Sequence, residues 1–274
     1  MKHYIPVLSI AGSDCSGGAG IQADLKTISA LGSYAATAIT AITVQNTCGV
    51  RAIHPVPAEI VKGQIAAVME DIHPEAIKIG MVNDTAVIRA IVESLKFYHP
   101  RHVVFDPVMV STSGHKLIED DAIRLITEEL MPLADVITPN LQEAEVLCGK
   151  QLSTVSDMQQ AAKELLKFGC KAVLLKGGHL GGNQMVDVLL MAGRTAPRLY
   201  SATKVESRNT HGTGCSLSSA IATLLAQGRS LPEAVDGAKT YVREGIRKGK
   251  DIEIGSGHGP LNHFFAPIPM KIKE

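Results

Sequence analysis

The sequence contains a short stretch, NTHGTGC, whose residue types suit the binding of an anion. It comes directly before residues 216–227, where apolar residues recur with the spacing of one helix face, and Gly228 is placed to end that helix. At the start of a helix, backbone N–H groups lack partners and the helix dipole adds partial positive charge. Four residues occupy that place: Gly212, Thr213, Gly214 and Cys215. We predict that they form a nest for an anion, for which a phosphate fits best, whereas an ordinary glycine turn with a buried cysteine is the alternative.

A second group of polar residues comes at the ends of predicted strands. The group consists of Gln45, Asp106, Asn140, Glu143 and Lys176. In open parallel sheets, ligands bind beyond the carboxyl ends of the strands, so these side chains are expected to converge. Asp106 and Glu143 offer hard oxygen ligands for Mg²⁺, directly or through water, and Lys176 offers a point charge for a phosphate. The pattern predicts an anionic, magnesium-dependent nucleotide site suited to phosphoryl transfer.

A glycine-rich loop at residues 12–20 lies between a short apolar run and a segment with helical spacing. Two of its glycines have the Walker A spacing, but Gly18 and Ala19 stand where Lys and Ser or Thr would grip phosphates and magnesium. The dinucleotide fingerprint also lacks its acidic ribose ligand, so both nucleotide patterns are incomplete. Asp24, one turn into the following helix, is either a carboxylate that complements the helix dipole or a substrate ligand.

The elements that position these residues alternate along the chain. Strands are predicted at residues 7–11, 37–44, 76–79, 103–105, 136–138 and 172–175, with a hairpin at 185–190 and 198–201. Helices are predicted from Pro57 to Ile72, from Thr85 to Phe97, from about Asp120 to Leu130, from a capping box of Ser156 and Gln159 to Gly169, and from a capping box of Ser230 and Glu233 onward. This pattern predicts an α/β fold, with a mostly parallel, twisted sheet covered by helices on both faces. We expect one domain over residues 1–274.

Composition narrows the class of partner. Lys plus Arg equals Asp plus Glu, at 27 each, with no basic run and few aromatic residues, so no nucleic-acid or membrane-surface partner is indicated. The five cysteines form no CxxC pair, which argues against a disulfide framework or a zinc ribbon. No apolar stretch approaches the length of a membrane span. We therefore expect a cytoplasmic protein with a small-molecule substrate.

Seven separate stretches carry a resemblance to a known family. They are AGSDCSGGAGIQADLKT, AITAITVQNT, KIGMV, DPVMVSTSG, TPNLQEAEVL, LLKGGH and NTHGTGCSLSSAIA. In this order they resemble the bacterial hydroxymethylpyrimidine/phosphomethylpyrimidine kinases of thiamine biosynthesis, within the ribokinase-like superfamily. The resemblance covers nearly the whole chain, from Val7 to about Phe264. It implies a three-layer α/β/α sandwich, a homodimer, ATP as donor, and two successive phosphorylations of 4-amino-5-hydroxymethyl-2-methylpyrimidine.

The resemblance also implies roles for individual residues. Those that match the family's pyrimidine pocket are Gly12, Asp24, Gln45, Met81 and Val108. Those that match its ATP and magnesium region are Asp106, Asn140, Glu143 and Lys176, and the anion hole is matched by Gly212, Thr213, Gly214 and Cys215. Sugar kinases of this fold carry an aspartate base after the anion-hole glycine, where this chain has Cys215. The identity of the base is therefore open, and the alternatives for Cys215 are a thiolate base and a small packing residue.

Two other functions are compatible with these residues. Pyridoxal kinases with a similar cysteine site exist within the same group, so a pyridoxal or pyridoxine kinase is the alternative within the class. A non-catalytic pyrimidine or vitamin sensor is the alternative outside it. A sensor needs neither a phosphate nest nor metal ligands, and the sequence has candidates for both.

Overall fold

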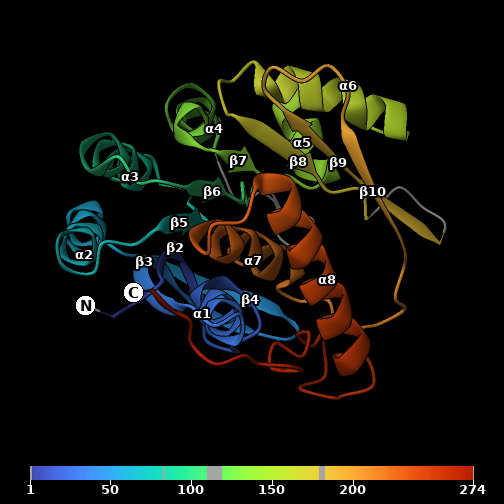
Figure 1. The fold of residues 1–274 in the computed structure, drawn as a ribbon. Coiled ribbons are helices and arrows are strands. Elements are labelled where there is room, and N and C mark those ends of the chain that lie inside the picture. Colours follow the sequence, from blue (N-terminus) through green and yellow to red (C-terminus); the bar gives the residue numbers. More distant parts are fainter. Residues whose placement is uncertain (1, 83, 110–118, 179–182, 274) are drawn as a thin grey trace.

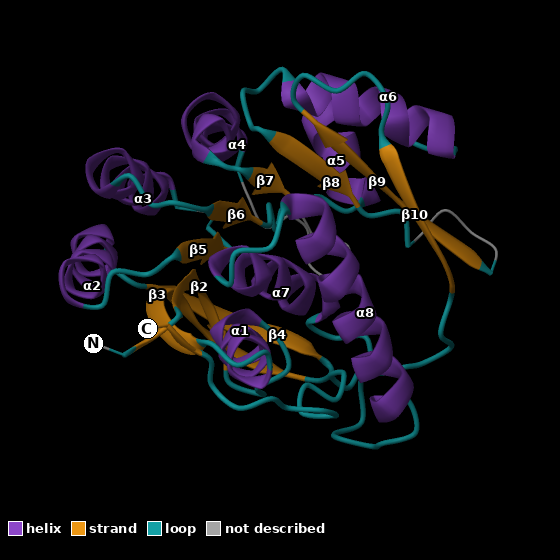
Figure 2. Cartoon of the chain, in the orientation of Figure 1, coloured by secondary structure: helices purple, strands orange, loops and turns teal. Residues whose placement is uncertain are grey.

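The computed structural model describes residues 2–82, 84–109, 119–178 and 183–273 of the chain. They form a nine-stranded sheet with the strand order β10-β9-β8-β7-β6-β5-β2-β3-β4 and a separate two-stranded ribbon, β1-β11 (Figures 1 and 2). The strands of the large sheet are β2 (Pro6–Asp14), β3 (Tyr34–Asn46), β4 (Gly49–Pro55), β5 (Ala76–Ile79), β6 (Val103–Phe105), β7 (Val136–Ile137), β8 (Ala172–Leu175), β9 (Gln184–Met191) and β10 (Arg198–Thr203). The ribbon joins β1 (His3–Tyr4) to β11 (Ile272–Lys273).

The middle of the sheet is parallel and its two edges are antiparallel. The strands from β3 through β2, β5, β6 and β7 to β8 pair in parallel, whereas β4 pairs antiparallel with β3, and β9 pairs antiparallel with both β8 and β10. The predicted mostly parallel sheet and the predicted hairpin are therefore confirmed. Strand β4 was not predicted, because all seven of its residues are exposed and leave no apolar pattern to read.

Helices cover both faces of the sheet (Figure 1). They are α1 (Gly20–Ala30), α2 (Ala58–Asp71), α3 (Thr85–Tyr98), α4 (Asp120–Leu125), α5 (Leu141–Cys148), α6 (Val155–Leu166), α7 (Thr213–Ala226) and α8 (Leu231–Gly249). Helices α2 to α6 bury their apolar side chains against one face, and α1, α7 and α8 bury theirs against the other. The three-layer α/β/α sandwich of the ribokinase-like fold is confirmed. In the described part of the chain, no helix is long and apolar enough to cross a membrane.

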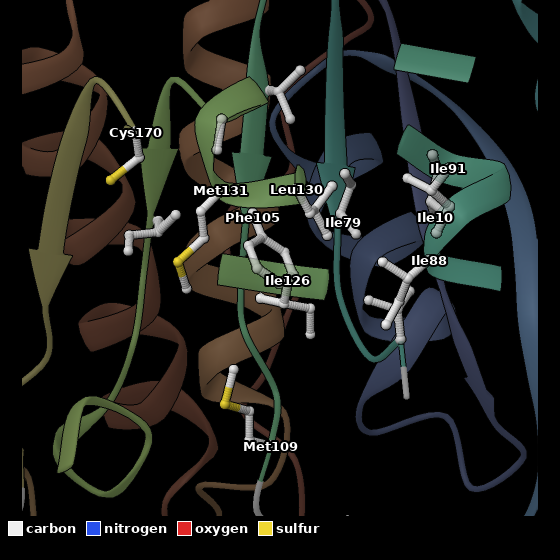
Figure 3. Close-up of a cluster of buried hydrophobic side chains, with 14 of the residues drawn as sticks. Ile10, Ile79, Ile88, Ile91, Phe105, Met109, Ile126, Leu130, Met131 and Cys170 are labelled. Carbon is white, nitrogen blue, oxygen red and sulfur yellow. The ribbon is translucent and has the colours of Figure 1, made fainter. Parts of the chain in front are cut away.

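The core on the α2 to α6 face is built from strand side chains that point away from α7. Phe105 from β6 packs there with Ile126 and Met131, which follow α4 (Figure 3). Alternation along β5 sends Ile77 and Ile79 into this core. Lys78, between them, is therefore directed toward the other face, where its side chain has no exposed surface. A charged group so deeply buried needs a partner, and that partner is Asp24 on α1.

Three details of the helices differ from the expectation. Helix α6 is capped by Thr154 with Asp157, not by Ser156 with Gln159, and it ends at Leu166. The segment that follows α4 continues as a π-helical turn (Ile126–Leu130) and a 3-10 turn (Met131–Leu133). Helix α5 was not predicted, although its capping box lies in the polar stretch after β7. The capping box of Ser230 and Glu233 at α8 is present as predicted.

The strand order determines where a ligand can enter. Strand β2 has β3 on one side and β5 on the other, so the connections that leave β2 and β5 diverge at the carboxyl edge of the sheet. Open α/β sheets bind ligands at such switch points. Helix α7 packs across the middle of the sheet on the α1 and α8 side (Figure 2). The site is assembled where the start of α7 meets this edge.

Candidate active site

The first turn of α7 has the geometry of an anion nest. Gly212 is its N-cap, with a left-handed φ of 76°, and no side chain caps the helix. A Cβ at Gly212 would lie 1.8 Å from the carbonyl oxygen of Gly18, so the glycine-rich loop after β2 packs directly against this turn. Glycine is required here both for the φ angle and for the close approach. The Thr213 N–H donates to the Thr210 carbonyl at 3.3 Å, whereas the N–H groups of Gly214 and Cys215 have no acceptor among the described residues, which suits the predicted anion site.

Asp106 and Lys176 lie beside this turn. The Lys176 ammonium is 2.9 Å from Asp106 Oδ1, which also accepts a hydrogen bond from the Thr138 hydroxyl at 2.9 Å. A Cβ at Gly214 would lie 3.5 Å from Lys176 Nζ and 3.6 Å from Asp106 Oδ2, so three strand ends and α7 converge. Burial opposes ionisation of Asp106, but the Lys176 and Lys78 ammonium groups outweigh it and lower the pKa of Asp106. Burial likewise opposes the charge on Lys176, but Asp106 and Glu143 raise its pKa, so the pair is ionised.

Asn140 and Glu143 form the capping box of α5. The Asn140 N–H donates to Glu143 Oε2 at 2.7 Å, and the Glu143 N–H donates to Asn140 Oδ1 at 2.9 Å. A bridge between Asn140 and Lys176 places this cap next to the Asp106 pair. Burial and the charge of Asp106 raise the pKa of Glu143 to about 7, against the opposing effect of Lys176. The side chains expected to bind nucleotide and metal are thus neighbours, and two of them, Asn140 and Glu143, also cap α5.

The donor set near Asp106 suits magnesium that arrives with a nucleotide. Among the described residues, no group of three or more His, Cys, Asp or Glu side chains is arranged to hold a metal ion. Mg²⁺ is commonly bound through one or two carboxylates together with substrate phosphates and water. The buried carboxylates of Asp106 and Glu143, which influence each other's charge, match that requirement. They fit a metal held jointly with phosphates and not a self-contained cage.

Four of the residues expected to bind the pyrimidine lie at or just after the ends of β2, β3, β5 and β6. A Cβ at Gly12 would lie 2.6 Å from Met81 Cε, so these two residues are in contact. Gln45 is half-buried, and its side-chain amide nitrogen lies 3.3 Å from His211 Nε2. Val108 is half-buried two residues after Asp106, and its N–H donates to the Asp106 carbonyl at 2.8 Å. Gly12, Met81 and Gln45 are thus brought to the loops that meet at the nest.

Asp24 lies beneath the site. Its carboxylate has no exposed surface and is 2.8 Å from Lys78 Nζ. It also accepts hydrogen bonds from the hydroxyl groups of Ser9 at 2.5 Å and Ser219 at 2.7 Å. With its oxygens taken up in this way, the carboxylate has no surface from which to touch a substrate directly. The sequence offered two interpretations of Asp24, a carboxylate that complements the helix dipole and a substrate ligand. The structure shows neither, because Asp24 forms a buried ion pair with Lys78.

Sequence reasoning overlooked two residues that join the loops of the site. Asp14 accepts hydrogen bonds from the N–H groups of Ser16, Gly18 and Ala19, and one of its oxygens lies 2.9 Å from His211 Nε2. Although burial opposes ionisation, these bonds lower the pKa of Asp14. An aspartate followed by serine and glycines is typical of an Asx turn, and that signal was available in the sequence. His211 has no comparable signal, since nothing local to it predicts a partner so distant in the chain.

Comparison with known proteins places the chain in a family. A family model described as phosphomethylpyrimidine kinase matches residues 14–262. The chain belongs to this family. It is 52% identical over 258 residues to the hydroxymethylpyrimidine/phosphomethylpyrimidine kinase of Rhizobium meliloti (strain 1021), which covers 94% of this chain and 96% of the relative.

Solved structures of phosphomethylpyrimidine kinases and of pyridoxal kinases share the fold. The crystal structure of phosphomethylpyrimidine kinase from Clostridium difficile 630 is 48% identical, with a TM-score of 0.79 over 88% of this chain and 99% of that one. The ADP complex of Bacillus subtilis pyridoxal kinase is 34% identical, with a TM-score of 0.88 over 95% of this chain and 97% of that one. Similarity of fold therefore does not by itself separate the two substrates.

Cys215 belongs to the first turn of α7, and its environment bears on its chemistry. Burial raises the pKa of the thiol to about 11, although Lys78 acts in the opposite direction. The helix N-terminus does not by itself give a thiolate here, because the carboxylates of Asp24 and Asp106 add to the effect of burial. At neutral pH the side chain is therefore a neutral thiol.

Replacing Gly212 with alanine is expected to destroy the nest. The left-handed φ and the contact with Gly18 both exclude a Cβ, so the first turn of α7 must shift and its N–H groups lose their common direction. We expect ADP affinity, measured by calorimetry, to fall at least about tenfold, since nest N–H groups provide charge-assisted hydrogen bonds. Gly228→Ala is the matched control, because Gly228 also has a left-handed φ, 87°, but nothing within 4 Å of its Cβ position. Equal loss of ADP affinity in both variants would contradict the nest.

Proposed function

We propose that this chain is an ATP-dependent hydroxymethylpyrimidine and phosphomethylpyrimidine kinase. It transfers a phosphoryl group to 4-amino-5-hydroxymethyl-2-methylpyrimidine and then a second one to the monophosphate. The observation that carries the proposal is the approach of the α7 nest to the Asp106 and Lys176 pair, with Gly214 within reach of both side chains. Membership of the phosphomethylpyrimidine kinase family supports the same assignment.

In this proposal the site acts mainly by charge and position. Phosphoryl transfer gathers negative charge on the transferred oxygens, and preorganised N–H groups and cations stabilise it. Lys176 exchanges part of its contact with Asp106 for a nucleotide phosphate, and the N–H groups of Gly214 and Cys215 receive the transferred group. Asp106 and Glu143 would hold Mg²⁺, which neutralises phosphate charge when bound. Asn140 supports this arrangement by fixing the start of α5 beside Lys176.

The acceptor is proposed to lie over Gly12 and Met81, with Gln45 and Val108 at its edges. A carboxamide both donates and accepts, so Gln45 can pair with the exocyclic amine and the adjacent ring nitrogen of an aminopyrimidine. The Gln45 amide nitrogen lies 3.3 Å from His211 Nε2, which supports this role because it places the amide next to the loop that carries the nest. In this arrangement the hydroxymethyl group points toward residues 212–215.

A pyridoxal kinase is the second candidate. The observation in its favour is the likeness to the Bacillus subtilis pyridoxal kinase, at 34% identity and a TM-score of 0.88. A non-catalytic sensor is disfavoured, because the chain retains the nest and the buried Asp106 and Lys176 pair, which binding of an uncharged vitamin does not need. We also propose that the chain acts as one domain, in a reducing cytoplasm where its five free cysteines persist.

The decisive experiment is a coupled assay of ATP consumption with four acceptors: hydroxymethylpyrimidine, its monophosphate, pyridoxal and pyridoxine. We expect the two pyrimidines to be the preferred acceptors. Asp106→Asn is expected to lower turnover on every acceptor by about 10²-fold or more, because the charge that pairs with Lys176 and metal is lost. Pyrimidine binding, followed by calorimetry, is expected to persist.

Asp135→Asn is the matched control for Asp106→Asn. Asp135 also pairs with a lysine, Lys171, at 2.7 Å, and accepts from the N–H of Val103, but it lies at the amino ends of the strands. Near-normal turnover of Asp106→Asn at limiting magnesium would refute the metal and phosphate role. A wild-type preference for pyridoxal over both pyrimidines would favour the second candidate.

The role of Cys215 can be separated by assaying the two steps. The alcohol must lose a proton as it attacks, whereas a phosphate monoester, with a second pKa of about 6, is already ionised at neutral pH. Because the Cys215 thiol is neutral, we expect Cys215→Ala to lower kcat for both acceptors by a similar factor, within about threefold of each other. A loss of about 10²-fold or more confined to the alcohol would instead show that Cys215 is the base.

We further propose that the enzyme is a homodimer that pairs through β4. This strand is at the edge of the sheet, and every residue in it is exposed, so one row of its backbone groups lacks a strand partner in the described sheet. Large apolar side chains gather on and beside it: Ile42, Val44, Val50 and Ile53. A second copy, turned by a two-fold axis, presents the same strand antiparallel and covers the same side chains.

Light scattering coupled to size exclusion tests this surface. The wild type is expected to be a dimer, and Val44→Lys with Ile53→Lys is expected to be a monomer, because charges would be placed within the apolar contact. Phe97→Lys is the control, since Phe97 is an exposed apolar side chain on α3, far from β4 in the fold (Figure 1). A monomeric wild type would overturn the dimer, and a dimeric double variant would overturn this interface.

A further inference from the structure

Lys78 is a fully buried lysine that has no role among the residues of the proposed reaction. It sits in the middle of β5, within the sequence AIKI, and its side chain has no exposed surface. Both Asp24 oxygens accept from its ammonium, at 2.8 Å and 3.0 Å. Burying such a pair is costly, and apolar residues of similar volume often serve stability as well or better. Packing alone therefore gives no reason for a charge at this position.

The ion pair joins the elements that carry the site. Asp24 belongs to α1 and binds Lys78 of β5, while Ser9 of β2 and Ser219 of α7 donate their hydroxyl hydrogens to it. Ser219 is one helical turn beyond Cys215. The carboxylate therefore anchors the beginning of α7 to the two central strands whose loops meet at the switch point. Its four hydrogen-bond contacts fix the position of the lysine charge.

The ammonium lies directly under the acceptor side of the site. A Cβ at Gly80 would be 2.7 Å from Lys78 Nζ, and Gly80 leads into Met81, which contacts Gly12. The Asp24 carboxylate that holds the ammonium also accepts from Ser219, one turn beyond Cys215, so the charge lies beneath the beginning of α7. The charged groups that influence Cys215 are Asp24 from α1, Lys78 from β5, Asp106 after β6 and Lys176 after β8.

We propose that Lys78 is a positioning residue for phosphoryl transfer, whose buried ammonium adds a fixed positive charge beneath the first turn of α7. The inference rests on the proposed kinase function. In a low-dielectric site, a preorganised charge stabilises developing negative charge without reorganisation. Lys176 moves its contacts as phosphates bind, whereas Lys78 is held by Asp24 throughout. Negative charge that develops on the acceptor oxygen during transfer is therefore stabilised by the Lys78 ammonium, which does not itself touch the substrate.

Two variants test the charge. Lys78→Gln removes it and keeps a donor, and the double variant Lys78→Met with Asp24→Asn removes both buried charges, so that no carboxylate is left unpaired. Thermal unfolding followed by circular dichroism identifies which variant is folded. In the folded variant we expect kcat to fall at least about tenfold on both pyrimidine acceptors, with KM for the pyrimidine changed less than about threefold.

A second readout does not depend on turnover. Cys15 and Cys48 are the exposed thiols, so they are replaced by serine in all proteins compared, and alkylation of Cys215 by iodoacetamide is followed by mass spectrometry between pH 7.5 and 9.5. Lys78→Gln removes only the positive charge and lowers the thiolate fraction of Cys215, so alkylation of this variant is expected to slow by at least about threefold at each pH. The double variant also removes the Asp24 charge, which acts in the opposite direction, so its alkylation is not expected to slow. A merely loosened structure would expose Cys215 and speed alkylation instead.

The outcomes distinguish this inference from the proposed function. Slower alkylation together with lower kcat supports the role of Lys78. A folded variant with wild-type kcat overturns it, and so does Lys78→Gln if its kcat falls while its alkylation is unchanged or faster, because that pattern indicates a structural effect. A wild-type protein that phosphorylates none of the four acceptors refutes the proposed function, whereas the alkylation experiment still measures the charge beneath α7.

Discussion

The close approach of Gly212 to Gly18 is the constraint on which the site depends. Only the absence of a side chain lets the turn before α7 come against the glycine-rich loop after β2. That contact sets the start of α7 at the switch point of the sheet, beside the residues that follow β6 and β8. Asp106 and Lys176 are then neighbours of Gly214 without any special property of their own. The position of one helix end thus determines which strand ends can act together.

Around this helix end the buried charges are balanced in pairs. Asp106 faces Lys176, and Asp24 faces Lys78, so the resting site contains two buried ion pairs. Each pair is costly to desolvate, and each is satisfied by additional hydroxyl donors from Thr138, Ser9 or Ser219. The Lys176 side chain keeps 16% of its surface exposed, whereas the Lys78 side chain has no exposed surface. This difference separates a lysine that can exchange partners from one that cannot.

The sequence predicted the features that are local and periodic. Strands β5, β6 and β8 coincide with the predicted ranges because both of their faces are buried and their apolar runs are continuous. The nest was predicted from glycines at the start of a helix, and the convergence of the strand-end residues from the rule that parallel strands end at one edge. Strand β4 escaped prediction because it is exposed throughout, and α5 escaped because its polar first turn was read only as ligands.

What the sequence could not supply were contacts between distant residues. Asp24 was read as a helix-dipole carboxylate or a ligand, and only the fold reveals Lys78 opposite it. A lysine within an apolar strand was a signal that a buried partner must exist, but not of which residue it was. In the same way, the sequence left open whether Cys215 is a thiolate base or a small packing residue. Burial and two neighbouring carboxylates raise the pKa of the thiol, and neither is visible along the chain.

The contact between Asp14 and His211 joins residues separated by 197 positions in the chain. Pairings of such long range form late in folding, because the entropy of closing the intervening chain must be overcome first. A nascent chain that emerges from the ribosome with β2, β3 and β5 complete has no nest, since residues 212–215 are made much later. The nest is consequently a property of the folded molecule, because it forms only when the start of α7 docks against the loop after β2.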